Sequence, residues 1–168
     1  LEDVKTGLRF LRASAETYKI NPRRVCAFGT SSGANTALLL GMTGNDPRYH
    51  TAAYAEQPDD VQLVVECFGP ADMLQLLEFD DELPEMLDGL AGAPWQEHRE
   101  KIVAMSPYLI ADEAAKYPPI YILHGSADRL IPYSQSERLY RKLRGMGKDV
   151  CMTCVENGPH EEEFWSKA

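Results

Sequence analysis

The segment Gly29-Thr30-Ser31-Ser32-Gly33 has the form G-x-S-x-G, which can present a serine as a nucleophile. In this form the serine lies on a sharp turn between a strand and a helix, and Gly29 and Gly33 leave room for that turn. The following helix would direct the Ser32 backbone amide at a developing oxyanion. Only Ser31 has glycines at both required positions. The pattern arises by chance in roughly one chain in twenty of this length, so its partners must be found as well.

A serine becomes a nucleophile only when a base lies within hydrogen-bond reach and an acid orients that base. After such a strand-to-helix turn, the acid and then the histidine follow the serine along the chain. Asp128 follows an apolar run at residues 120–123, and His160 follows another at 150–155. Both would therefore lie at the carboxyl edge of a parallel sheet, where catalytic groups cluster. We predict a triad of Ser31, Asp128 and His160.

Other polar residues compete for these roles. Asp72 follows an apolar run at residues 61–68 and is the second candidate for the acid, although we prefer it as a helix N-cap. His124 ends the run before Asp128, and we expect it to stabilise the loop that presents that acid. His50 and His98 lie in polar stretches and are expected at the surface.

Strand and helix signals alternate along the chain. Short apolar runs predict strands at residues 25–28, 61–68, 120–123 and 150–155. Helical patterns occur at residues 2–18, 32–42, 133–145 and 161–167, the first with apolar positions Val4, Leu8, Leu11 and Ala15. Residues 73–105 are helical and acidic without a clear strand, so we interpret them as an insertion or lid. The alternation predicts an α/β fold with a mostly parallel sheet flanked by helices.

Composition excludes several classes of function. The chain has 168 residues, 44% of them hydrophobic, which suits one domain with a sizeable core. Its formal net charge of -9 argues against binding to nucleic acid or to an anionic membrane. No apolar run approaches the roughly 20 residues of a membrane span. The charged first residues do not resemble a signal peptide, and we expect a cytoplasmic protein.

The four cysteines are expected to be free, buried thiols. Cys26 and Cys67 lie in apolar runs. Cys151 and Cys154 have the CxxC spacing, but residues three apart in a strand point to opposite faces, which opposes a shared metal or a disulfide.

Three blocks of the sequence resemble the esterase/lipase branch of the α/β-hydrolases, a group that includes acetyl esterases, feruloyl esterases and relatives of the prolyl oligopeptidases. The nucleophile block is residues 24–37. The acid block consists of Ser106-Pro107, residues 118–128, Ile131-Pro132 and Gln135-Ser136. The histidine block consists of Gly158-Pro159-His160 and Phe164-Trp165. The resemblance omits only about residues 43–60 and 74–104. It implies a single, partial α/β-hydrolase catalytic domain over residues 1–168.

The resemblance implies a serine carboxylester hydrolase that needs no metal or organic cofactor. Its substrates would be small-molecule esters with short acyl groups, including acetyl or feruloyl esters of carbohydrates. Family members carry roughly 80 to 120 further residues before the first helix of this chain, among them N-terminal strands and a His-Gly-Gly type loop that completes the oxyanion hole. Without them the strand at residues 25–28 becomes an apolar edge, to be covered by a second copy or by the absent segment. The alternative is a truncated, catalytically weak or inactive fragment that associates through this edge.

Overall fold

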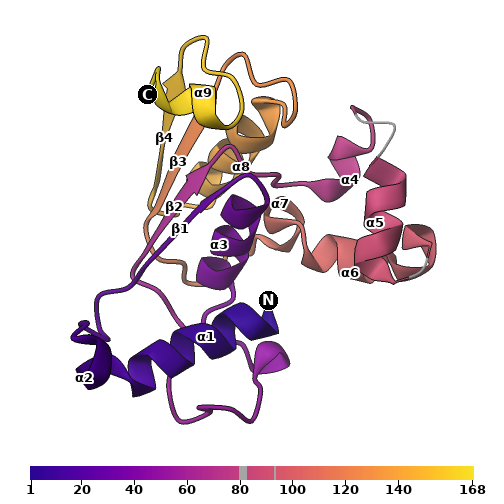
Figure 1. Cartoon of the computed structure of the whole chain (residues 1–168). Coiled ribbons are helices and arrows are strands. Elements are labelled where there is room, and N and C mark those ends of the chain that lie inside the picture. The colour runs from indigo at the N-terminus through magenta and orange to yellow at the C-terminus, as the bar shows by residue number, and fades with distance from the viewer. Residues whose placement is uncertain (80–82, 93) are drawn as a thin grey trace.

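Four parallel strands form a sheet whose spatial order, β1-β2-β3-β4, is their order in the chain. The computed structural model describes residues 1–79, 83–92 and 94–168 (Figure 1). The strands lie close to the predicted runs, and they are β1 (Cys26–Thr30), β2 (Leu63–Cys67), β3 (Ile120–Gly125) and β4 (Val150–Val155). The parallel register brings the carboxyl ends of all four strands to one edge of the sheet, where the predicted site residues follow.

Helices occupy the connections between strands. The α-helices are α1 (Glu2–Ala13), α2 (Ala15–Tyr18), α3 (Ser32–Met42), α4 (Met73–Leu76), α5 (Leu83–Ala91), α6 (Arg99–Ala104), α7 (Pro107–Ile110), α8 (Ser134–Gly145) and α9 (Glu162–Trp165). Two short 3₁₀ segments are η1 (Pro47–Tyr49) and η2 (Trp95–His98). The single helix predicted at residues 2–18 is interrupted at Ser14, so that it forms α1 and α2.

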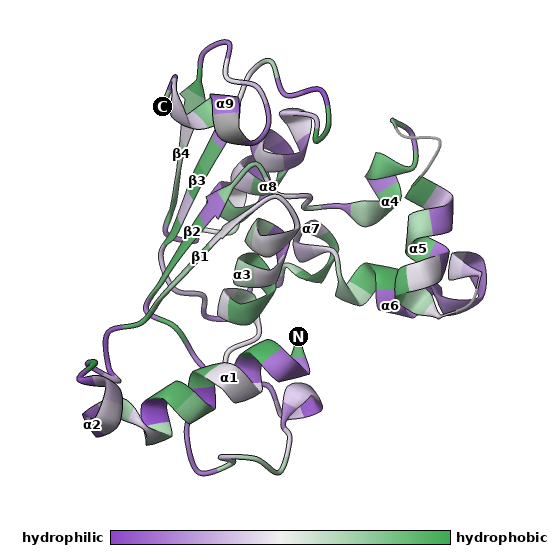
Figure 2. Ribbon diagram, in the orientation of Figure 1, coloured by the Kyte–Doolittle hydropathy of each residue, from purple (hydrophilic) through white to green (hydrophobic). Residues whose placement is uncertain are grey.

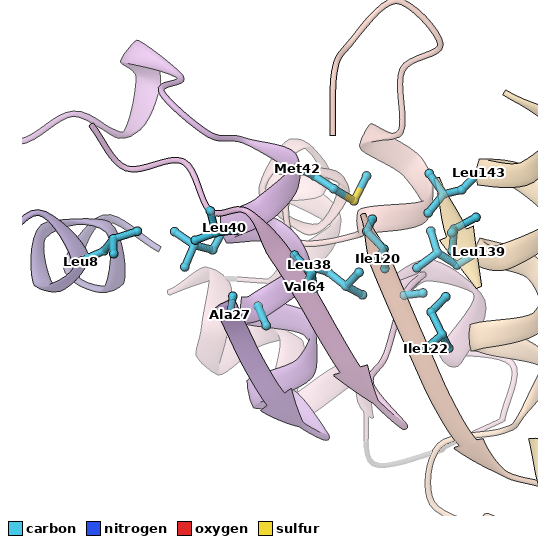
Figure 3. Close-up of a cluster of buried hydrophobic side chains, with 14 residues drawn as sticks. Leu8, Ala27, Leu38, Leu40, Met42, Val64, Ile120, Ile122, Leu139 and Leu143 are labelled. Carbon is cyan, nitrogen blue, oxygen red and sulfur yellow. The ribbon is translucent and has the colours of Figure 1, made fainter. Parts of the chain in front are cut away.

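The main core lies between one face of the sheet and the helices α3 and α8. α3 packs on β1 and β2, and α8 packs on β3 and β4. Alternate strand residues point into this layer and meet leucines of both helices (Figure 3), among them Ala27, Val64, Ile120, Ile122, Leu38 and Leu139. This packing fixes the sheet beneath the predicted site.

The opposite face of the sheet is covered only in part. α9 lies over the carboxyl ends of the strands, where Phe164 packs with Cys67 and Phe68. Farther along the strands, Phe28 is 60% exposed and Leu63 is 36% exposed. β1 forms the edge of the sheet and includes apolar residues (Figure 2). The sheet is thus flanked by helices as predicted, with an open apolar region beside β1.

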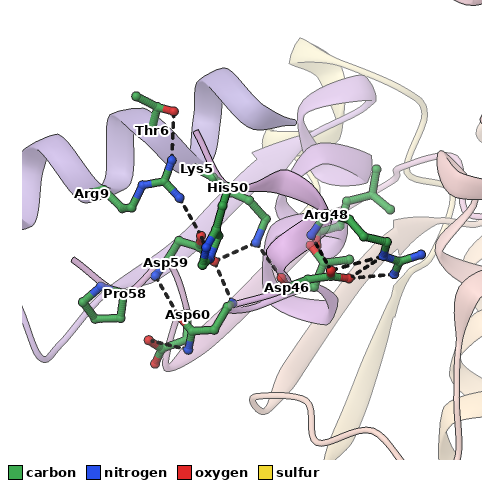
Figure 4. Close-up of polar contacts among 12 residues, drawn as sticks. Lys5, Thr6, Arg9, Asp46, Arg48, His50, Pro58, Asp59 and Asp60 are labelled. Atoms are coloured by element: carbon green, nitrogen blue, oxygen red, sulfur yellow. Dashed lines mark hydrogen bonds and ion pairs between the residues drawn. The ribbon is translucent and has the colours of Figure 1, made fainter. Parts of the chain in front are cut away.

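The apolar positions predicted for α1 are buried only in part. Leu8 belongs to the main core, whereas Val4 and Leu11 are each 42% exposed. Beside Leu8, the buried face carries Lys5 and Arg9, which both bind Asp59 in the loop before β2 (Figure 4). Lys5 Nζ lies 2.7 Å from Asp59 Oδ1, and Arg9 Nη1 lies 3.0 Å from Asp59 Oδ2. Burial of these cations depends on a partner from the loop, which the hydrophobic pattern of α1 cannot reveal.

The prediction of four buried thiols is wrong for three of them. Cys67 is buried, and burial raises its pKa to about 12. Cys26, Cys151 and Cys154 are exposed. Cys26 and Cys151 point to the open face of the sheet, and Cys154 lies on the edge strand β4. The apolar runs therefore predicted the strands correctly. The exposure of each cysteine side chain depends instead on whether a helix covers that face of the sheet.

Within residues 73–105, the described part forms α4, α5, η2 and α6, as the helical pattern predicted, while residues 80–82 and 93 lie outside the described residues. These helices have a small core of their own around Leu87 and Ile102. They project to the right of α3 in Figure 1. Among all described helices of the chain, none combines the length and the apolar character that crossing a membrane requires.

Candidate active site

Ser31 occupies a strained turn between β1 and α3. Its φ of 51° and ψ of -125° lie in a region that residues with a side chain rarely adopt. The Ser31 amide donates a hydrogen bond to the carbonyl of Cys67 at the end of β2, at 3.0 Å. At Gly29 an added Cβ atom would lie 2.1 Å from the carbonyl oxygen of Gly33. The turn closes so tightly that only glycine fits at position 29.

The explanation that the sequence suggested for Gly33 is not supported. Apart from its chain neighbours and the nearby backbone of α3, no described atom lies within 4 Å of a Cβ atom added at Gly33. Gly33 therefore contributes its backbone to the tight turn, whereas Gly29 is the position that must lack a side chain. Ser32 is the first residue of α3, where an amide has no partner within the helix. Its role as the oxyanion donor stays a prediction.

The structure brings together Ser31, His160 and Asp128. His160 Nε2 lies 3.1 Å from Ser31 Oγ, and His160 Nδ1 lies 2.6 Å from Asp128 Oδ2. The Asp128 side chain is fully buried, and the His160 side chain is 7% exposed. An ionised aspartate beside Nδ1 requires the proton on that nitrogen, which leaves Nε2 free to accept the serine proton. The arrangement can therefore raise the nucleophilicity of a serine hydroxyl.

Close backbone contact holds the acid loop against the histidine loop. A Cβ atom at Gly125 would lie 2.0 Å from the carbonyl oxygen of Gly158. The Ala127 amide donates to that same oxygen at 3.0 Å, and the Asn157 amide donates to Ser126 Oγ at 2.9 Å. These contacts join the segments after β3 and β4, and so set the distance between the two side chains that they carry.

Three hydrogen bonds and a longer contact with His124 orient the Asp128 carboxylate. Oδ1 accepts from the amides of Leu130 and Ile131, each at 2.9 Å. Oδ2 faces His160 Nδ1 and, at 3.3 Å, Nε2 of His124. Burial raises the pKa of Asp128, but the bonds from His124, His160 and Ile131 outweigh burial and hold that pKa below its ordinary value. The carboxylate is therefore ionised at neutral pH.

The other candidates have the structural roles that we preferred. Asp72 is the N-cap of α4, where its side chain accepts a hydrogen bond from the Gln75 amide. Asp72 Oδ2 also lies 3.3 Å from Arg138. His124 Nε2 lies 2.9 Å from the Ile131 carbonyl, so it ties together the loop that presents Asp128.

The roles of three residues at the site escaped sequence analysis. Phe68 packs its ring edge-on against the His160 ring, with 4.7 Å between the ring centroids, and it has a positive φ of 47°. Glu66 and Ser136 are fully buried and hydrogen-bond to each other beside His124. Ser136 belongs to the acid block of the resemblance, which gave it no role. Glu66 carries a signal as a carboxylate inside an otherwise apolar strand, whereas no motif marks Phe68.

An open pocket of about 690 Å³ lies beside the turn that carries Ser31. Its wall includes Ser32 and Asn35 from α3. Met73 and Met105, at the ends of α4 and α6, are also part of the lining. The pocket therefore lies between the helix that begins at the nucleophile turn and the helices of residues 73–105.

Comparisons with known proteins identify a family and several relatives. The BD-FAE family model matches residues 1–143. The probable carboxylic ester hydrolase LipM of Mycobacterium tuberculosis is 31% identical over 150 residues, which are 87% of this chain and 34% of LipM. Esterase LipC of the same organism is 28% identical over 153 residues, which are 87% of this chain and 36% of LipC. The chain thus spans about a third of the length of these curated relatives.

Solved structures share the fold. A truncated form of a carbohydrate esterase from gut microbiota superposes with a TM-score of 0.84 at 26% identity, covering 96% of this chain and 61% of the other. The propionate-bound esterase Est2 from Thermogutta terrifontis superposes with a TM-score of 0.69 at 20% identity, covering 95% of this chain and 54% of the other. With residues 1–143 matched by its family model, the chain belongs to the BD-FAE family and has the α/β-hydrolase fold of these esterases.

Proposed function

We propose that the protein is a serine carboxylester hydrolase that acts on short acyl esters. The observation that carries the proposal is that Ser31, on its strained strand-to-helix turn, lies within hydrogen-bond distance of His160, which in turn contacts Asp128. The similarity to LipM and LipC supports ester hydrolysis, and the similarity to a carbohydrate esterase supports esters of carbohydrates as the substrates. Acetyl or feruloyl groups are our proposal for the acyl part.

In the proposed first half-reaction, Ser31 Oγ attacks the ester carbonyl carbon while His160 Nε2 accepts the serine proton. The carbonyl oxygen becomes an oxyanion and accepts a hydrogen bond from the Ser32 amide. Asp128 holds the His160 ring and stabilises its charged form. The intermediate collapses, the bond to the alcohol oxygen breaks, and His160 returns the proton to the departing alcohol. The acyl group remains on Ser31 as an ester.

The second half-reaction repeats these roles with water as the nucleophile. His160 removes a proton from water as the water attacks the acyl carbon, and Ser31 then leaves with that proton. No redox change occurs, and the products are a carboxylic acid and the free serine. The chain's own groups supply every proton transfer of this cycle.

The pocket beside Ser32 is our candidate for binding part of the ester. Its lining combines Met73 and Met105 with Asn35 and Lys101. Thioether side chains adapt to apolar groups of different shapes, while the Lys101 ammonium, which donates one hydrogen bond to the Ala91 carbonyl, has further protons for oxygen atoms of a ligand. We therefore propose that the helices of residues 73–105 contribute to substrate selection.

A fluorophosphonate probe, which reacts with activated serines, tests the proposal directly. We expect covalent labelling of the 168-residue chain, with rates that fall about 10⁴-fold or more in Ser31→Ala and in His160→Ala. Ser14→Ala, which lies between α1 and α2 away from the site, is the matched control and should label as the unaltered chain does. Labelling that persists in Ser31→Ala would disprove the assignment of the nucleophile. A folded chain that does not label would show that the isolated chain has no working site.

The open edge beside β1 favours a second candidate function. Phe28 is 60% exposed on that strand, and an uncovered apolar edge promotes association. In this alternative the chain is a weak or inactive hydrolase that associates through the edge. Failure of the labelling experiment together with self-association would favour it over the hydrolase.

A further inference from the structure

A chain of buried polar side chains leads from the middle of the sheet to Asp128. Glu66 on β2 points to the face covered by α8, where Ser136 Oγ lies 2.8 Å from Glu66 Oε1. The same Ser136 oxygen lies 2.7 Å from His124 Nδ1. On its other side, His124 Nε2 lies 2.9 Å from the Ile131 carbonyl and 3.3 Å from Asp128 Oδ2. Two consecutive polar side chains, Ser136 and His124, thus connect Glu66 to the carboxylate opposite His160.

The positions of the protons in this chain are constrained. His124 Nε2 faces two acceptors, a carbonyl and a carboxylate, so that nitrogen carries a proton. Ser136 has one hydroxyl proton to donate, either to Glu66 or to His124. If Ser136 donates to Glu66, His124 Nδ1 must also be protonated, and the chain holds an imidazolium and a carboxylate. If Ser136 donates to Nδ1, Glu66 must be the protonated donor to Ser136, and all three side chains are neutral.

Burial favours the neutral arrangement. Glu66, Ser136 and His124 are all 0% exposed. Within the described residues, Glu66 Oε2 has no hydrogen-bond partner, and an isolated buried carboxylate is costly. Burial raises the pKa of Glu66 to about 8, since the hydrogen bonds that would favour its ionised form do not offset the loss of water.

Among the described residues, neither Lys nor Arg forms an ion pair with Glu66 or His124. The Tyr133 ring meets the His124 ring edge-on at 5.7 Å, and Asp128 Oδ2 lies 3.3 Å from His124 Nε2. Cys67, whose pKa burial raises to about 12, follows Glu66 in β2 but packs on the other face of the sheet.

We propose that Glu66, Ser136 and His124 are positioning residues for Asp128, joined in a neutral hydrogen-bond chain that begins at a protonated Glu66 and ends at Asp128 Oδ2. The proposal rests on the proposed function, since it assumes that Asp128 orients His160. A protonated Glu66 donates to Ser136, which in turn donates to Nδ1 and thereby fixes the tautomer with the proton on Nε2. His124 and His160 bond to the same oxygen of Asp128.

Neutrality of His124 has a consequence for catalysis. During acyl transfer His160 becomes a cation that Asp128 must stabilise. A charged His124 on the same carboxylate oxygen would compete for Asp128 and repel that cation. The proton held on Glu66 keeps His124 neutral, so the chain can orient Asp128 without weakening its interaction with His160.

Three variants separate donation from charge. Glu66→Gln keeps a donor of the same shape at Ser136 but cannot ionise, whereas Glu66→Met and Ser136→Ala remove the donor at successive links. We expect Glu66→Gln to retain the unaltered rate of Ser31 labelling, and the other two to slow it about 10- to 100-fold, the range for partners that act through a catalytic group.

Two signals of the resting protein report on the chain without any turnover. Nitrogen-15 NMR of labelled histidine should show His124 unprotonated at Nδ1 and protonated at Nε2. The far-downfield proton signal of His160 Nδ1 should be unchanged in Glu66→Gln and shifted in Ser136→Ala. These signals distinguish the two proposals. If they respond as expected but Ser31 is not labelled, the proposed hydrolase is disproved, while the proposed hydrogen-bond chain from Glu66 to Asp128 is still supported.

Several results would disprove the proposed hydrogen-bond chain from Glu66 to Asp128. One is an imidazolium at position 124 in the unaltered protein at neutral pH. Another is a folded Glu66→Gln that labels as slowly as Ser136→Ala, because a carboxylate would then be required. A third is unchanged labelling and an unchanged downfield signal in Ser136→Ala. If Glu66→Met does not fold, Glu66→Gln and Ser136→Ala still decide between these outcomes.

Discussion

Single residues at the site differ in how visible they are to sequence reasoning. The positions of Ser31, Asp128 and His160 could be predicted because a motif, an order along the chain and the edge of a parallel sheet restrict them. Glu66 could not be assigned a role, since its meaning depends on Ser136 and His124, which reach it from two other elements. The polar partners of a buried group come from tertiary packing, and no local pattern encodes them.

The buried carboxyl of Glu66 predicts a pH dependence of stability. Its pKa rises from an ordinary 4.5 in the unfolded chain to about 8 in the folded protein, so the folded state binds the extra proton between these values. The stabilising contribution of the neutral carboxyl is complete below about pH 4.5 and is lost as the pH rises toward 8. Relative to Glu66→Gln, the unaltered protein should lose up to about 1.4 kcal/mol of unfolding free energy per pH unit in this window.

Urea unfolding at pH 5, 6.5 and 8 (about the limits of that window) measures this difference. Glu113→Gln, at an exposed position, is the matched control and should follow the unaltered protein at each pH. Parallel pH profiles for the unaltered protein and Glu66→Gln would contradict a protonated Glu66.

At the scale of elements, strands were easier to predict than helix faces. The apolar runs located β2, β3 and β4 within a few residues, and the interior of a parallel sheet explains why. The apolar pattern of α1 placed Leu8 correctly on the buried face, but that face also carries Lys5 and Arg9, while Val4 and Leu11 are exposed. These cations bind Asp59 in the loop before β2, so the position of α1 depends on that loop.

The shared partner of α1 should be essential for stability. Asp59 is 0% exposed and binds both Lys5 and Arg9 (Figure 4). Asp59→Asn keeps the shape of the side chain but leaves two buried cations without an anion. We expect a loss of about 3–5 kcal/mol of unfolding free energy, measured by urea titration. Arg48→Ala, which removes an exposed ion pair with Asp46, should leave the urea midpoint unchanged. Equal effects of the two substitutions would show that the buried cluster is not a special contact.

At the scale of the molecule, the parallel direction of the strands followed from the alternation of elements, whereas the order of the strands and the exposure of the sheet did not. Cys26 and Cys151 were expected inside and are exposed. Exposure of a strand residue depends on which layer lies over its face, and that layer is specified by residues distant in the sequence. The open region beside β1 is therefore the feature of the whole molecule that most needs an experimental test.

In isolation, we expect the 168-residue chain to associate with a second copy through the edge at β1. Phe28 is 60% exposed on this edge strand, and a strand edge with unpaired backbone groups and an apolar side chain favours pairing. Size-exclusion chromatography with light scattering should give a mass above the 18.8 kDa of one chain, increasing with concentration. Phe28→Lys should shift the mass toward the monomer, because it places a charge on the edge. Leu130→Lys, at a position that is 56% exposed in the loop after β3, is the matched control and should leave the mass unchanged. A stable monomer at every concentration would mean that the edge does not pair. The apolar region beside β1 would then be exposed to solvent in the isolated chain.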